Sequence, residues 1–154
     1  MHSRIFQISK EPIDKADYID SGYYDYDHWF TNSVADYVSD DCNRDADIEW
    51  LKSCAKGLIF DKDNYGDYFV VKNKEDYFES KFKTFQTSLD KIKECTIEDF
   101  SNGMLGIWSL KNAYEEKFGF YVDVDGEVIS FDSFVRCFAV NEKWYVGNTL
   151  DYHC

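Results

Sequence analysis

The chain has 154 residues, of which 44% are hydrophobic and 31% are charged, and it contains a single proline. This length predicts one domain, or at most two small ones, and the composition excludes disorder and a collagen-like repeat. The net charge is −13, from 30 acidic and 17 basic residues. Such a charge disfavours direct binding to nucleic acid and to anionic membranes, because both attract proteins with a surplus of Lys and Arg.

Cysteines and apolar stretches indicate where the protein resides. We expect no signal peptide in the N-terminal residues, and the uncharged stretch at residues 101–110 is too short to cross a membrane. Five cysteines, at positions 42, 54, 95, 137 and 154, form no C-x-x-C pair. We therefore expect a soluble, cytoplasmic protein whose five thiols are free. The excess of Lys over Arg, 14 to 3, points to an AT-rich bacterial or phage genome.

Residues 11–50 supply most of the negative charge. This acidic segment holds twelve acidic and two basic residues, which gives it a charge of −10. Aromatic and aliphatic residues are threaded through it, and those of residues 27–38 fall at helical spacing. Residues 45–56 predict a second helix, with acids near its start and lysines near its end, as the helix dipole favours.

The middle of the chain predicts a strand pair followed by helices. Residues 58–60 and 67–72 predict two strands joined across residues 61–66. Residues 74–94 form the clearest helical pattern, and residues 107–118 predict another helix after a helical turn from residue 97. An apolar stripe runs along the helix over 74–94, through Phe78, Phe82, Phe85, Leu89 and Ile92. We expect the whole stripe to be buried against strands from residues 120–146.

The C-terminal third predicts two hairpins. Asp125 and Gly126 separate two β-rich runs, residues 120–124 and 127–131, and this dipeptide is a strong hairpin signal. Residues 138–140 and 144–146 predict a second hairpin, whereas the pattern over 132–137 does not distinguish helix from strand. The expected fold is therefore a single α+β domain over residues 1–154. It has several helices packed on a small antiparallel sheet formed largely by the C-terminal third, with strands in 58–72 and 120–146.

Two patterns in the sequence are candidates for chemistry. Residues 61–72 begin like a calcium-binding loop, but Lys72 replaces the closing glutamate, so we interpret them as a polar turn. A Cys/His hydrolase would need His28 or His153 with a cysteine, and the chain end at residues 151–154 is a poor place for catalytic groups. We assign no catalytic residue, no metal ligand and no cofactor.

The acidic segment is the candidate partner-binding site. Carboxylates interleaved with Tyr and Trp present charge at about the density of a nucleic-acid backbone, and aromatic side chains anchor interfaces. We expect the carboxylates to cluster on one exposed side, with the aromatic residues at least partly accessible. The candidate partner-binding residues are Asp20, Tyr23, Tyr24, Asp25, Tyr26, Asp27, Trp29, Asp40, Asp41, Asp45 and Asp47.

The composition favours a non-enzymatic acidic interaction protein that binds a basic protein partner. Inhibitors, immunity proteins and DNA-mimic, antirestriction-like proteins share this composition, although no motif assigns the chain to any of these groups. Two alternatives stay open. One is a small enzyme with a Cys/His or carboxylate-based pocket, and the other is a soluble domain whose charge serves solubility.

Overall fold

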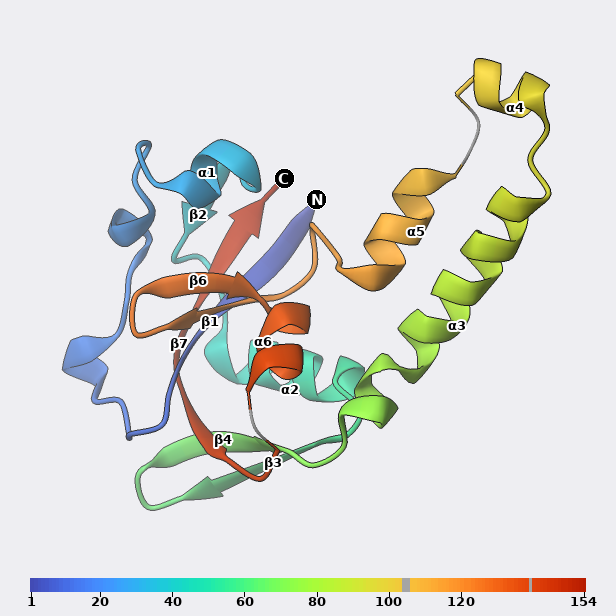
Figure 1. Ribbon diagram of the computed structural model, residues 1–154. Coiled ribbons are helices and arrows are strands. Elements are labelled where there is room, and N and C mark those ends of the chain that lie inside the picture. The colour runs from blue at the N-terminus through green and yellow to red at the C-terminus, as the bar shows by residue number, and fades with distance from the viewer. Residues whose placement is uncertain (104–105, 139) are drawn as a thin grey trace.

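A computed structural model shows an α+β domain built on a seven-stranded mixed sheet (Figure 1). The structure describes residues 1–103, 106–138 and 140–154. The strands are β1 (His2–Ser9), β2 (Tyr37–Ser39), β3 (Leu58–Asp63), β4 (Gly66–Val71), β5 (Tyr121–Val124), β6 (Glu127–Ser130) and β7 (Lys143–His153). Their order in the sheet is β3-β4-β7-β1-β5-β6, and β2 pairs with the end of β7.

Two strands from opposite ends of the chain form the centre of the sheet. β1 lies between β7, to which it is antiparallel, and β5, to which it is parallel. The expectation of an antiparallel sheet formed largely by the C-terminal third is therefore wrong in both respects. The partners of β1 are more than 100 residues away along the chain, so no local pattern announces this pairing.

Two of the three predicted hairpins are present. β3 and β4 pair in antiparallel register, as do β5 and β6. Asp125 and Gly126 both have positive φ, 53° and 89°, which is the requirement of a two-residue type I′ turn. The hairpin predicted over 138–146 is wrong: residues 138 and 140 lie in no strand, residue 139 lies outside the described residues, and 144–146 belong to the much longer β7.

Helices surround the sheet (Figure 1). They are α1 (Trp29–Ser33), α2 (Arg44–Cys54), α3 (Lys74–Lys93), α4 (Ile97–Ser101), α5 (Ile107–Tyr114) and α6 (Phe131–Cys137), together with short 3₁₀ turns at Lys15–Asp17 and Ser21–Tyr24. α2, α3 and α4 lie where the sequence predicts them, each with a side-chain N-cap: Asn43, Asn73 and Thr96. α5 ends four residues earlier than predicted.

The helix predicted over 27–38 is wrong in its second half. α1 ends at Ser33, and the chain then extends into β2, which pairs with β7. The backbone N–H of Asp36 donates to the carbonyl of His153 at 2.7 Å, which begins this pairing. Tertiary pairing to β7 therefore overrides a helical spacing of apolar residues.

Each face of the sheet carries its own hydrophobic core, because side chains alternate along a strand. On one face, Phe6 and Trp144 pack with Leu51 of α2 and Phe134 of α6. On the other face, Ile5 and Leu150 pack with residues of the acidic segment, including Tyr24 and Phe30. Residues 19–38 of the acidic segment are therefore a layer of the fold and not a tail, and the end of the segment, in α2, packs on the first face through Ile48.

α3 and α5 form an arm that projects away from the sheet (Figure 1). The two helices pack against each other, and only the first turns of α3 reach the core, through Tyr77 and Phe78. Phe82 is 57% exposed, so the expectation that the whole stripe is buried against strands is wrong. Within the described residues, no helix has both the length and the apolar character needed to cross a membrane.

Candidate functional site

The structure brings together the two stretches that hold most of the predicted partner-binding residues. One stretch is residues 20–29, and the other is residues 40–45. They meet where the backbone N–H and the hydroxyl of Ser21 donate to the two carboxylate oxygens of Asp40, at 2.9 and 2.6 Å. Asp20 caps the adjacent 3₁₀ turn by accepting from the N–H of Gly22 at 2.9 Å.

Polar side chains of the central strands fix the acidic segment to the sheet. The amide of Gln7 on β1 donates to the carbonyl of Asp17 and accepts from the N–H of Ile19. Asn148 on β7 donates to the carbonyl of Ile19 at 2.7 Å. These bonds satisfy the backbone of a segment that has little regular structure, so its exposed side chains have a defined support.

Six of the seven predicted carboxylates are exposed. These are Asp20, Asp25, Asp27, Asp40, Asp41 and Asp45. Among the described residues, Asp45 pairs with the neighbouring Arg44 at 3.3 Å, and the other five have no cationic side chain within ion-pair distance. None of the six is paired with a lysine. Their negative charges are therefore largely uncompensated by the chain itself.

The expectation that Asp47 belongs to the exposed surface is wrong, because its side chain is buried. Its Oδ1 accepts from Nε of Arg4 at 2.7 Å, and its Oδ2 accepts from the hydroxyl of Thr149 at 2.8 Å. Arg4 also pairs with Asp151. Asp47 lies on the apolar face of α2, four residues before Leu51, and this position was the available signal in the sequence.

The expectation that Tyr24 is at least partly accessible is also wrong, because its side chain is buried in the core. Its hydroxyl donates to Oδ2 of Asp123 at 2.8 Å. Burial, reinforced by the Asp123 carboxylate, raises the pKa of Tyr24 well above its usual range, so the hydroxyl keeps its proton. Tyr24 therefore holds the acidic segment on the sheet and cannot contact a partner.

The other three aromatic candidates are accessible. Tyr26 is 90% exposed, and Tyr23 and Trp29 are each about half exposed. The hydroxyl of Tyr23 donates to the carbonyl of Gly126 at 2.9 Å, which fixes the position of its ring. The imidazole of His28 lies between Tyr24 and Trp29 and caps α1 by accepting from the N–H of Phe30. Tyr23 and Trp29 thus pack against neighbouring aromatic side chains.

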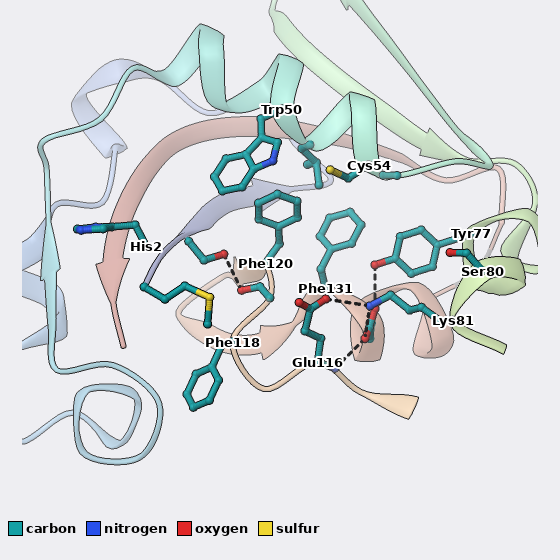
Figure 2. A pocket seen from close by; sticks show the side chains of 16 residues that line it. His2, Trp50, Cys54, Tyr77, Ser80, Lys81, Glu116, Phe118, Phe120 and Phe131 are labelled. Carbon is teal, nitrogen blue, oxygen red and sulfur yellow. Dashed lines mark hydrogen bonds and ion pairs between the residues drawn. The ribbon is translucent and has the colours of Figure 1, made fainter. Parts of the chain in front are cut away.

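A cleft of about 280 Å³, which the sequence did not reveal, lies on the other side of the sheet (Figure 2). Trp50 and Cys54 of α2 line one wall, and Tyr77 and Lys81 of α3 line another. Phe120 and Phe131 form much of the floor. These residues come from distant parts of the chain, and no motif connects them.

The polar groups of the cleft are bonded to one another. The buried Asp132 accepts from the hydroxyl of Tyr77 at 2.8 Å, from Nζ of Lys81 at 3.0 Å and from the N–H of Glu116 at 3.0 Å. Lys81 also pairs with Glu116 at 3.2 Å. Burial and the Asp132 carboxylate raise the pKa of Tyr77 well above its usual range. The network therefore joins α3 to α6.

The cysteines give no support to a Cys/His site. All five are free, and within the described ranges no thiol is hydrogen-bonded to a histidine. Cys42 donates to the carbonyl of Thr149 at 2.9 Å, and burial raises the pKa of this thiol. A raised pKa keeps the thiol protonated, which is opposite to what a nucleophile requires.

The loop at residues 61–66 closes a hairpin. Oδ1 of Asp63 accepts from the N–H groups of Tyr65 and Gly66, and its Oδ2 accepts from Lys143 at 2.7 Å. Across the part of the chain that the structure describes, no three side chains of His, Cys, Asp or Glu are placed to hold a metal ion.

Comparison with other proteins adds no assignment. No protein-family model matches the sequence. Searches of curated proteins and of solved structures likewise give no significant match.

Proposed function

We propose that the chain is a non-enzymatic acidic interaction protein that binds a basic protein partner through residues 20–29 and 40–45. The observation that carries this proposal is the set of exposed carboxylates without lysine partners. If these charges served only solubility, we would expect acidic and basic residues to be interspersed on this surface. A surface of one sign instead attracts a partner of the other sign and accelerates its association.

The exposed rings supply the second part of the interface. Tyr23, Tyr26 and Trp29 lie within the same stretch as Asp20, Asp25 and Asp27. Carboxylates steer the encounter, whereas desolvated aromatic side chains supply most of the affinity that holds a complex together. Such a surface suits the nucleic-acid channel of a basic enzyme or the face of a basic toxin, so an inhibitor, immunity or DNA-mimic role belongs to this proposal. The proposal includes no direct binding to nucleic acid or membranes.

The compartment belongs to the same proposal. Five free thiols are compatible with a reducing environment, and we therefore place the protein and its partner in the cytoplasm.

Affinity capture with charge-matched baits tests the proposal. The first bait is the unaltered chain, the second carries Asp27→Lys, Asp41→Lys and Asp45→Lys, and the third carries Asp61→Lys, Glu75→Lys and Glu79→Lys. The second and third baits have the same net charge, and all six altered side chains are exposed. Any retention that depends on net charge alone is therefore equal for these two baits.

We expect a basic protein to be retained by the first and third baits and lost from the second. Once it is identified, its association rate with the unaltered chain should fall steeply as salt is raised, because steering between opposite charges is screened. Retention of the same proteins by the second and third baits would contradict the proposal and would favour a solubilising role for the charge.

A further inference from the structure

The outer part of the arm, of which the structure describes residues 82–103 and 106–114, projects from the rest of the molecule (Figure 1), and at its base Tyr114 packs against Arg136 of α6. Beyond the first turns of α3, the main packing partner of this helix is α5. α3 has 20 residues and is therefore about 30 Å long, so most of its length projects past the sheet. The arm is an antiparallel helical hairpin whose outer faces have no covering layer among the described residues.

Large apolar side chains are exposed along this arm. Phe82, Phe100, Trp108 and Tyr114 are each between 57% and 66% exposed, and two isoleucines, Ile97 and Ile107, are 82% and 46% exposed. Taking about 200 Å² for each aromatic side chain, the four rings alone expose about 500 Å². These rings are spread over α3, α4 and α5, and with the isoleucines their exposed area approaches the roughly 800 Å² per partner of a standard interface.

The charge of the arm differs from that of the whole chain. Residues 82–114 contain four lysines and four acidic residues, so the arm is neutral in a chain of net charge −13. A basic partner is drawn to the acidic segment and gains nothing from a neutral face. A face without net charge does not repel a second copy, whereas two acidic faces would repel each other, so the arm is the surface on which two copies of this acidic chain can meet.

We propose that the arm is a homodimer interface, on which the arm of a second copy docks about a two-fold axis. Two helical hairpins packed face to face form a four-helix bundle, which buries the apolar faces that neither copy covers alone. At the base of the arm a groove of about 300 Å³, lined by Phe82, Phe85 and Tyr114 together with two cationic side chains, Lys81 and Arg136, is placed to receive side chains of the second copy. Trp108 is the largest exposed ring on the arm and is the expected anchor.

This inference is independent of the proposed function. The stretches 20–29 and 40–45 lie on the other side of the molecule from the arm (Figure 1), so a dimer formed through the arms leaves both of them accessible in each copy. The variants that test the arm alter no carboxylate, and the baits that test the acidic segment alter no exposed apolar residue. Failure of either proposal is therefore visible without reference to the other.

Sedimentation velocity over a wide range of concentration tests the dimer. We expect the unaltered chain to reach twice its monomer mass of 18.2 kDa. Trp108→Ser and Phe82→Ser should each raise the dimer dissociation constant by at least about 30-fold, the factor for an anchor worth about 2 kcal/mol. Tyr65→Ser is the matched control, because Tyr65 is 72% exposed on the β3–β4 turn, far from the arm. Circular dichroism should show all three variants folded, since each change is at the surface.

The same measurement contains the outcomes that overturn the proposal. A chain that stays monomeric at every concentration excludes the dimer. A dimer that Trp108→Ser and Phe82→Ser leave intact, or that Tyr65→Ser weakens equally, places the interface elsewhere. Open-ended assembly in place of a closed dimer excludes two-fold pairing of the arms.

Discussion

Position on a helix gives two neighbouring aspartates of the acidic segment opposite roles. Asp45 and Asp47 are two residues apart on α2, so their side chains lie on nearly opposite sides of the helix. The Asp45 side chain is 91% exposed, whereas that of Asp47 is buried against Arg4 and Thr149. One residue is available to a partner, and the other joins α2 to β1 and β7.

We expect Asp47→Ala to lower the free energy of unfolding by about 3 kcal/mol, because it deprives the mostly buried Arg4 guanidinium of one of its two carboxylate partners. Asp45→Ala, the matched change on the exposed side, should cost less than about 1 kcal/mol. Urea denaturation at neutral pH measures both values. Equal losses for the two variants would show that Asp47 is not the connection described above.

At the scale of elements, local patterns predicted what local interactions determine. α2 and α3 have N-caps and apolar stripes within their own sequences, and the Asp125–Gly126 turn specifies its hairpin. β1 could not be predicted, because its partners lie on β5 and β7, far along the chain. The periodicity of apolar residues predicted an apolar face for α3, but it could not show that the helix extends beyond the sheet. Phe82 was therefore wrongly predicted to be buried.

The candidate site, too, was predictable only where it depends on local sequence. Charge density predicted the exposure of Asp20, Asp25, Asp27, Asp40, Asp41 and Asp45, but it wrongly predicted that of Asp47 as well. The burial of Tyr24 was not, because it depends on Asp123, a residue 99 positions later. The cleft beside Trp50 and Lys81 was also unpredictable, since its lining residues meet only through the packing of α2, α3 and α6.

The β3–β4 hairpin is attached to β7 by a surface ion pair that makes a pH-dependent prediction. The hydrogen bond from Lys143, supported by those from Tyr65 and Tyr145, lowers the pKa of Asp63 to about 2. A lowered folded-state pKa means that the pair stabilises the fold above the unfolded-state value of about 3.9, and that this contribution is lost as pH falls toward 2.

Lys143→Met should therefore raise the pKa of Asp63 toward its ordinary value, as measured by NMR titration of the side-chain carboxyl carbon. Lys62→Met serves as the control, because Lys62 contacts Asp67 and not Asp63. If both variants leave the Asp63 titration unchanged, the ion pair does not persist in solution.

At the scale of the whole molecule, the chain separates its two candidate surfaces by charge. The acidic segment carries −10, and the outer arm carries no net charge. Binding through the acidic segment should therefore weaken strongly with salt, whereas association through the arm should respond little, because burial of apolar surface does not depend on screening. One salt series applied to both measurements thus distinguishes the two surfaces.

Concentrating charge in one segment should also reduce the stability of the folded chain, and this cost is measurable. Among the described residues, the carboxylates of Asp27 and Asp41 have neither hydrogen-bond nor ion-pair partners, so in the fold they experience mainly repulsion from neighbouring acids. We expect Asp27→Asn with Asp41→Asn to raise the melting temperature at low ionic strength by about 2 °C or more, equivalent to somewhat under 1 kcal/mol. The gain should vanish as salt shortens the screening length from about 30 Å to about 3 Å. Glu49→Gln with Glu79→Gln is the control, because it removes the same charge from acids that are paired with Lys52 and Lys83, and it should give no gain. Equal melting temperatures for the two double variants at low salt would mean that Asp27 and Asp41 are compensated, and the acidic segment would then lose the free negative charge on which partner binding depends.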